Sequence, residues 1–128
     1  ITGVVRLMGA ETRSVRMDLG DDGWTLDVEK VAAACDSRTK AIFFASPGNP
    51  TGAVLPVPVQ KQLLELSRKT GIWIFSDEVY SRMSYEMPMV PSFSDIAEPE
   101  DRVIIINSFS KSWSMTGSRL GGLETGLP

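Results

Sequence analysis

The stretch IWIFSDEVY, residues Ile72 to Tyr80, joins a short apolar run to a cluster of acidic and aromatic side chains. A continuous apolar run of this length is typical of a strand that is buried on both faces of a parallel sheet. Two other runs, KAIFFAS (residues 40–46) and RVIIIN (residues 102–107), have the same form. We therefore predict three buried strands, over residues 40–46, 72–76 and 102–107.

Amphipathic segments alternate with these runs. TLDVEKVAAACDSRT (residues 25–39) has apolar residues at helical spacing, and its Asp27 can cap a helix. VPVQKQLLELSRKTG (residues 57–71) shows the same spacing and ends at Gly71. TRSVRMDL (residues 12–19) alternates apolar and polar residues and predicts a further strand. This alternation predicts an α/β fold, with a mostly parallel sheet and helices on its faces in three α/β/α layers.

A polar segment follows each of the three buried runs: PGNPTG, DEVY and SFSK, in chain order. Ligands of open α/β sheets bind outside the carboxyl ends of the strands. In a parallel sheet these three segments would open onto one edge. The sequence therefore predicts one shared site at that edge.

The composition excludes several classes of function. A net charge of −3 gives no basic field for nucleic acid or an anionic membrane, and the apolar runs are too short to cross a bilayer. The chain has no histidine, which excludes histidine-based triads and histidine-ligated zinc. Its single cysteine, Cys35, excludes a thiolate metal cage and an internal disulfide, and fits a reducing, cytoplasmic compartment. Lys, Tyr, Asp or Glu must carry any acid–base chemistry.

The first two polar segments allow more than one interpretation. The proline and glycine content of SPGNPTG is enough for an ordinary tight turn, and that is the simpler interpretation of the segment alone. Alternatively, Asn49 lies between Gly48 and Pro50 in a restricted backbone that would aim its amide at a hydroxyl or phenolate oxygen. Asp77 could pair with a cationic ligand nitrogen, with Tyr80 offering a phenol nearby, or it could belong to an ordinary acidic pair at a strand end. A Walker B interpretation is rejected, because the sequence has no GxxxxGK[ST] segment.

The third segment combines hydroxyl groups with two cations. Ser108, Ser110 and Arg119 could bind a phosphate through two hydroxyl donors and one planar guanidinium. Lys111 would then lie beside a cation in a semi-buried setting, and both conditions lower the pKa of an amine and favour its nucleophilic form. The alternative is a simple helix start, with Ser110 as its cap and Lys111 in solvent.

Together, SPGNPTG, SDEVY and SFSKSWSMTGSRLG follow the order and separations found in the class I and II aminotransferases. Over essentially its whole length the chain resembles this aspartate aminotransferase-like group of fold-type-I enzymes. The resemblance implies pyridoxal 5′-phosphate as the cofactor. It also implies transfer of an amino group between an L-amino acid and a 2-oxo acid through a lysine Schiff base. One alternative is a pyridoxal-phosphate lyase or synthase of the same fold, because such enzymes share the cofactor-binding residues. The other alternative is a non-catalytic fragment that acts as an interaction module.

The resemblance also assigns roles to residues. Lys111 would form the internal aldimine and later carry the proton, and Asp77 would pair with the pyridine nitrogen and keep it protonated. Asn49 and Tyr80 would hydrogen-bond the phenolate oxygen of the ring. Lys111, Asp77 and Tyr80 are thus the expected catalytic residues.

Ser108, Ser110 and Arg119 would hold the cofactor phosphate by the same resemblance. Ser118 and Gly122 depart from the family pattern, since many relatives carry a bulky aromatic residue at each of these places. Family members are also considerably longer. We therefore expect residues 1–128 to be the central part of a large cofactor domain, without the N-terminal segment and the small domain of its relatives, and the complete protein to be a homodimer.

Overall fold

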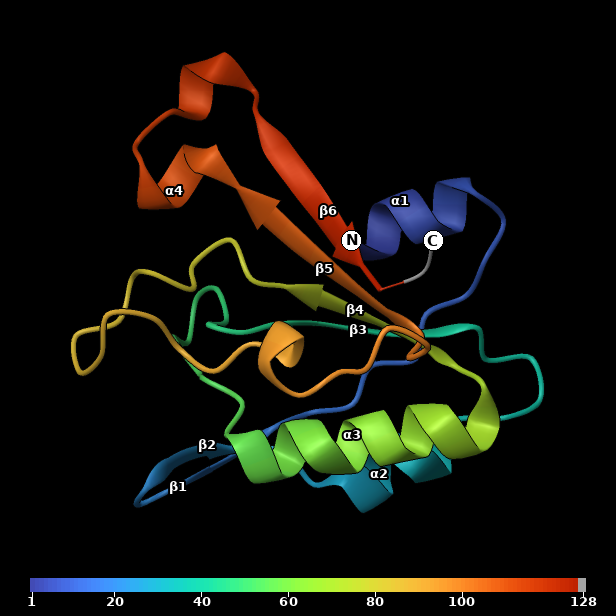
Figure 1. Cartoon of the computed structure of the whole chain (residues 1–128). Helices are drawn as coiled ribbons and strands as arrows, with labels where there is room; N and C mark the ends of the chain where they lie inside the picture. Colours follow the sequence, from blue (N-terminus) through green and yellow to red (C-terminus); the bar gives the residue numbers. More distant parts are fainter. Residues whose placement is uncertain (127–128) are drawn as a thin grey trace.

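A four-stranded sheet lies at the centre of the computed structural model, which describes residues 1–126. Strands β3 (Ala41–Ala45), β4 (Trp73–Asp77) and β5 (Val103–Ser108) run parallel, and β6 (Gly121–Thr125) pairs antiparallel with β5. The strand order is β3-β4-β5-β6 (Figure 1). The predicted α/β class, with a mostly parallel sheet, is confirmed, and so are the three strands predicted from the apolar runs.

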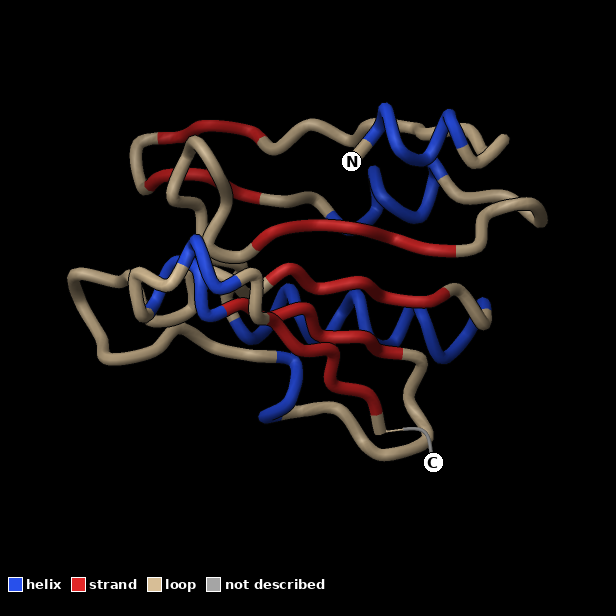
Figure 2. The backbone as a smooth tube through the Cα atoms, turned by 90° about the horizontal axis from the view of Figure 1, so that it is seen from above, coloured by secondary structure: helices blue, strands red, loops and turns tan. Residues whose placement is uncertain are grey.

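Two helices pack below this sheet in the view of Figure 1. Helix α2 (Val28–Ala34) begins after Asp27, whose side chain accepts a hydrogen bond from the Glu29 backbone N–H at 2.9 Å. Helix α3 (Val57–Thr70) ends at Gly71, which adopts a left-handed conformation with φ 74°. Seen from above, α3 runs beneath the strands (Figure 2). The predicted cap at Asp27 and the predicted stop at Gly71 are confirmed, although α2 is shorter than expected.

The hydrophobic core lies between these helices and one face of the sheet. It combines side chains from α2, α3, the loop before α3, strands β4 and β5 and a short 3-10 helix, η1 (Phe93–Asp95): Val31, Leu55, Leu63, Leu64, Ile74, Phe93, Val103 and Ile105. Burying such side chains is the main stabilising term of a small α/β unit. The core therefore fixes the strands whose ends carry the predicted site residues.

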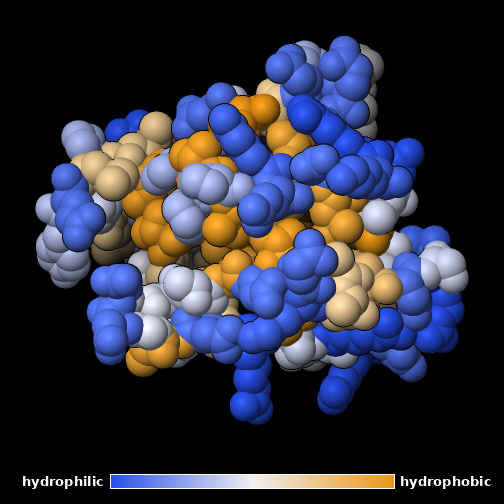
Figure 3. All heavy atoms as spheres, turned by 90° about the horizontal axis from the view of Figure 1, so that it is seen from below, coloured by the Kyte–Doolittle hydropathy of each residue, from blue (hydrophilic) through white to orange (hydrophobic). Residues whose placement is uncertain are grey.

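The opposite face of the sheet is not covered to the same extent. Residues of β4 alternate between buried and half-buried, β5 does the same as far as Ile106, and Phe43 of β3 is 39% exposed. The expectation of strands buried on both faces is therefore wrong for the described chain, because α2 and α3 both lie on the other face (Figure 1). Even the face seen from below shows hydrophobic atoms among hydrophilic ones (Figure 3).

The N-terminal region departs most from the prediction. Residues 12–17 form no strand, and only a short hairpin follows, made of β1 (Asp18–Gly20) and β2 (Gly23–Thr25). Val15 and Met17 pack against the hydrophobic core from a segment that is not a strand. The apolar residues of this segment therefore alternate with polar ones because they reach the core, and not because the segment pairs with another strand. Before it, helix α1 (Thr2–Leu7) has no buried residue.

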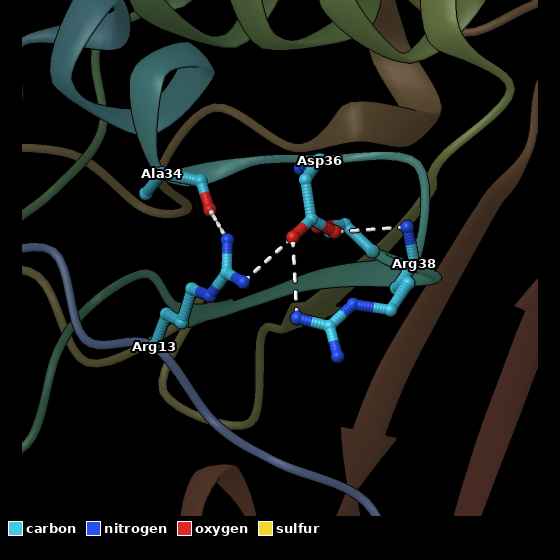
Figure 4. A network of polar contacts seen from close by, with 5 residues as sticks. Arg13, Ala34, Asp36 and Arg38 are labelled. Carbon is cyan, nitrogen blue, oxygen red and sulfur yellow. Dashed lines mark hydrogen bonds and ion pairs between the residues drawn. The ribbon is translucent and has the colours of Figure 1, made fainter.

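A polar network ties this extended segment to the end of α2 (Figure 4). Arg13 donates hydrogen bonds to the Ala34 carbonyl (2.9 Å) and to the Asp36 carboxylate (2.6 Å). Asp36 also lies 3.6 Å from the Arg38 guanidinium. Hydrogen bonds from the Arg38 backbone and the Arg13 side chain lower the pKa of Asp36 to about 2. The network therefore keeps this carboxylate charged and the segment in place.

Strand β6 was not predicted, because the sequence GGLET has no apolar run. A Cβ atom at Gly121 would lie 2.9 Å from the Asn107 carbonyl oxygen, so the pairing with β5 requires a glycine there. A Cβ atom at Gly122 would meet nothing within 4 Å. Within residues 1–126, no helix combines the length and apolarity that a membrane span requires.

A bidentate ion pair joins the loop between η1 and β5 to helix α3. Arg68 donates to the two carboxylate oxygens of Asp101 at 2.7 and 2.6 Å, and the Asp101 side chain is only 7% exposed. The Glu98 backbone N–H donates to the same carboxylate at 2.8 Å. The hydrogen bond from Arg68 is the main reason why the pKa of Asp101 lies below its ordinary value.

Replacing Asp101 by asparagine is expected to lower the free energy of unfolding at pH 7 by about 2 kcal/mol, because a charged hydrogen-bonded pair is lost. Since the folded pKa is depressed, this stabilisation is present above the ordinary aspartate pKa and is lost as the pH falls through the folded value. Urea unfolding of both proteins at neutral and acidic pH measures the difference, which should shrink at low pH. Glu65→Gln, at an exposed pair with Lys69, is the control and should change little. An equal loss in both variants would contradict the prediction.

Candidate active site

The carboxyl ends of β3, β4 and β5 meet at one edge, as expected from the parallel pairing. Ala45, Asp77 and Ile106 lie in register across the three strands. The loop that carries Asn49, the turn that carries Tyr80 and the turn that carries Lys111 therefore leave the sheet side by side. This arrangement brings together segments that are about sixty residues apart in the chain.

Asn49 and Tyr80 are in direct contact. The Asn49 side-chain amide donates a hydrogen bond to the Tyr80 hydroxyl oxygen at 3.2 Å. The two ends of the loop that carries Asn49 are joined by a buried hydrogen bond, in which the Leu55 backbone N–H donates to the Ser46 hydroxyl at 2.9 Å. The two groups that were expected to share one ligand oxygen thus lie next to each other.

Lys111 lies in the short helix α4 (Phe109–Ser112), directly after β5. Its Nζ atom lies 5.8 Å from the centre of the Tyr80 ring. The turn is anchored by aromatic contacts, since the Trp113 ring packs 5.1 Å from Phe109 and 5.4 Å from the Arg82 guanidinium. Lys111 itself is exposed, so the expected semi-buried setting is wrong for the described chain.

Ser108, and not Ser110, caps α4. The Ser110 backbone N–H donates to the Ser108 hydroxyl at 3.1 Å, and that hydroxyl in turn donates to the Leu120 carbonyl at 3.3 Å. Arg119 follows the 3-10 helix η2 (Thr116–Ser118) with a left-handed φ of 51°, and one of its N–H groups donates to the Thr116 carbonyl at 3.2 Å. The segment around Lys111 is therefore the start of a helix, as the alternative interpretation predicted, but its cap is Ser108 and not Ser110.

The three groups predicted to bind phosphate, Ser108, Ser110 and Arg119, line one cleft of about 280 Å³ together with Lys111. The lining also includes two residues that sequence reasoning missed, Val79 and Thr116. Val79 could have been included, because it lies between two predicted site residues. Thr116 lies within the segment SFSKSWSMTGSRLG, but its residue type and position did not distinguish it from the neighbouring hydroxyl residues. The structure thus gathers four of the seven predicted site residues around one cleft.

Asp77 occupies the end of β4 and is half-buried. Its carboxylate accepts a long hydrogen bond, 3.4 Å, from the Val79 backbone N–H. It is not among the residues that line the cleft, although Val79, two positions on, is. Asp77 therefore lies at the end of β4, two residues before the nearest lining residue of that strand's turn, while the hydroxyls and Arg119 line the cleft.

A second cleft, of about 160 Å³, lies between the segment before β5 and the end of β6. Three of its lining residues are acidic, namely Glu98, Asp101 and Glu124. Asp101 is already paired with Arg68, and the lining includes no lysine or arginine. The lining of this cleft has no amine and no cation for an anionic ligand, so the chemistry points to the cleft at Lys111.

The pattern of the family described as "Aminotransferase class I and II" matches residues 1–124. The chain belongs to the class I and II aminotransferases. Membership in this family implies pyridoxal 5′-phosphate as the cofactor.

Individual aminotransferases show the same similarity. A probable aspartate aminotransferase of Methanocaldococcus jannaschii is 40% identical over 114 residues, which cover 89% of this chain and 29% of the relative. An aminotransferase from Escherichia coli superposes with a TM-score of 0.89 at 29% identity, covering 99% of this chain and 31% of that one. A PLP-dependent aminotransferase from Streptococcus suis gives 0.80 at 32% identity, over 95% of this chain and 31% of that one. The chain thus spans about a third of the length of these aminotransferases.

The hydrogen-bond donors and charged groups at the candidate site fit pyridoxal 5′-phosphate. Ser110 and Arg119 offer a hydroxyl and further guanidinium N–H groups to a phosphate, and Lys111 adds a second cation. The Asn49 amide and the Tyr80 phenol can hydrogen-bond a phenolate oxygen, and the Asp77 carboxylate can pair with a ring nitrogen. The Ser108 hydroxyl would have to turn away from the Leu120 carbonyl to donate to the same phosphate.

Proposed function

We propose that the protein transfers an amino group between an L-amino acid and a 2-oxo acid with pyridoxal 5′-phosphate as its cofactor. The observation that carries this proposal is the juxtaposition of the Asn49–Tyr80 pair with Lys111, beside a cleft of hydroxyls and one arginine, at the carboxyl edge of the sheet. When bound, the cofactor supplies an electron sink for the charge left by loss of the substrate's α proton.

The chain's own residues take three roles in this proposal. Lys111 Nζ holds and moves the proton, since it is the one amine that lines the cleft. The Asp77 carboxylate pairs with a cationic ring nitrogen and keeps its proton in place. Asn49 and Tyr80 orient the ring by hydrogen bonds to its phenolate oxygen, and Tyr80 OH can still donate because it accepts from Asn49.

Ser108, Ser110 and Arg119 hold the phosphate in this proposal. Arg119 suits that role because a guanidinium matches a phosphate through parallel N–H donors, and one of its own N–H groups is already fixed on the Thr116 carbonyl. A grip of this kind would hold the phosphate in the cleft beside Lys111 and so limit the movement of a bound cofactor.

The proposal extends to the larger protein. We assign residues 1–128 to the central part of a large cofactor domain, because the chain spans 29% of its Methanocaldococcus jannaschii relative. The uncovered apolar face of the sheet and the exposed Lys111 support further polypeptide, including a second subunit of a homodimer, around the site. A cytoplasmic location is proposed from the single free cysteine.

Mixing the purified 128-residue chain with pyridoxal phosphate, an amino donor and a 2-oxo acid tests this extension. We expect weak cofactor binding and little or no amino-group transfer, because the cleft is open and Lys111 is exposed. The full-length protein should form new amino acid from the 2-oxo acid under the same conditions. Robust turnover by the chain alone would refute the domain assignment, and ammonia or carbon dioxide in place of the new amino acid would favour a lyase.

A further inference from the structure

Glu78 is a buried carboxylate that the proposed chemistry does not use. It follows Asp77 at the end of β4, and it is only 3% exposed. Its Oε1 atom accepts hydrogen bonds from the Ser76 hydroxyl at 2.9 Å and from the Phe93 backbone N–H at 3.2 Å. No lysine or arginine within residues 1–126 forms an ion pair with it. Burying a carboxylate without a cation is unfavourable for stability, so we expect Glu78 to have a role other than stabilising the core.

The position of Glu78 in the chain indicates that role. Residues 79–92 leave β4, carry Tyr80 outward through an exposed, methionine-rich segment, and return at Phe93. The Glu78 side chain joins the residue where this excursion departs to the residue where it returns. Its backbone is fixed as well, because the Glu78 N–H donates to the Ile106 carbonyl at 2.9 Å and its carbonyl accepts from Ser81 at 2.9 Å.

The alternation along β4 places the Glu78 side chain on the face that holds Ile74 and Ser76, which are buried, and Asp77 on the other face. Glu78 therefore cannot touch a ligand beside Asp77. It acts on the site only through the backbone between Asp77 and Tyr80. That backbone decides where the Tyr80 ring lies relative to Asn49 and Lys111.

We infer that Glu78 is a positioning residue, whose carboxylate oxygen clasps the two ends of the 79–92 excursion and so places Tyr80 for the cofactor. This inference rests on the proposed function for the identity of the ligand. What matters in it is the reach of the side chain and its acceptor oxygen, and not its charge.

Two conservative variants separate reach from charge in the full-length protein. Glu78→Gln keeps the length and one acceptor oxygen but removes the charge. Glu78→Asp keeps the charge but retracts the carboxylate from the Phe93 N–H. We expect Glu78→Gln to bind pyridoxal phosphate within about threefold of the wild type, and Glu78→Asp to bind it about tenfold more weakly, which corresponds to one lost hydrogen bond. Glu86→Gln, at an exposed position of the same excursion, is the matched control.

Two further measurements distinguish positioning from a general loss of stability. The pH at which the visible band of the bound cofactor changes should move in Glu78→Asp and in Tyr80→Phe, and the double variant should move it no further than Tyr80→Phe alone. Amide hydrogen exchange of the cofactor-free protein should speed up at Phe93 in Glu78→Asp only. Equal weakening in both Glu78 variants, or additive shifts in the double variant, would overturn the inference. Absence of any pyridoxal phosphate binding by the wild type would refute the proposed function, while the exchange measurement would still decide the role of Glu78.

Discussion

Lys111→Ala is expected to lower amino-group transfer by the full-length protein by about 10³-fold, because the variant has no amine at the cleft to hold and move the proton. The other cation at the cleft, Arg119, cannot replace it, since a guanidinium is not deprotonated in proteins. Borohydride reduction followed by peptide mass analysis should find the cofactor attached at residue 111 in the wild type and nowhere in the variant. Initial rates with an amino donor and a 2-oxo acid measure the loss.

Lys61→Ala is the matched control for this prediction, because Lys61 is an exposed lysine of α3, far along the chain from the site segments. It should leave both the rate and the attachment unchanged. A Lys111→Ala protein that keeps more than about a tenth of the wild-type rate would contradict the role assigned to Lys111.

Asp77→Asn is expected to lower the turnover rate by about a hundredfold and to weaken cofactor binding, because the neutral amide cannot stabilise a cationic ring nitrogen. The side-chain oxygen of asparagine can still accept from the Val79 backbone N–H, so the turn should keep its shape. Titration with pyridoxal phosphate, followed by single-turnover rates of the saturated protein, separates binding from chemistry. Asp22→Asn, in the exposed turn between β1 and β2, should show neither effect. Wild-type turnover in the saturated Asp77→Asn protein would rule out the assigned pairing.

The central part of the fold was predictable because each local signal agrees with its surroundings. The run at residues 41–45 is apolar without interruption. Gly71 ends α3 in a left-handed conformation, which glycine adopts readily, and Asp27 caps the start of α2. These signals depend on neighbours within a few residues, and a sequence displays them directly. The parallel pairing was predicted from the continuous apolar runs and the amphipathic segments that alternate with them.

The edges of the fold were not predictable in the same way. Residues 12–17 alternate because two side chains reach the core, and the sequence does not show whether a partner strand is present. Strand β6 exists because Gly121 lets the backbone approach Asn107 closely, and a glycine gives no strand signal. Both features depend on long-range contacts.

The candidate site shows the same division. Residue types and spacing selected Lys111, Arg119 and the hydroxyls around the cleft, since their chemistry is visible in the sequence. The sequence could not show that Lys111 is exposed or that Glu78 is buried. Exposure depends on which segments cover a side chain, and the acidic pair at residues 77 and 78 is divided by the strand between the two faces of the sheet.

The order of the strands bears on how the chain folds. Because β3, β4, β5 and β6 are neighbours in space in the same order as in the chain, each strand can dock on the one synthesised before it. Within residues 1–126, no strand of this sheet inserts between two strands that precede it in the chain. The turn with Lys111 lies between β5 and β6, so Lys111 and Arg119 reach their places in the cleft together, when β6 docks on β5.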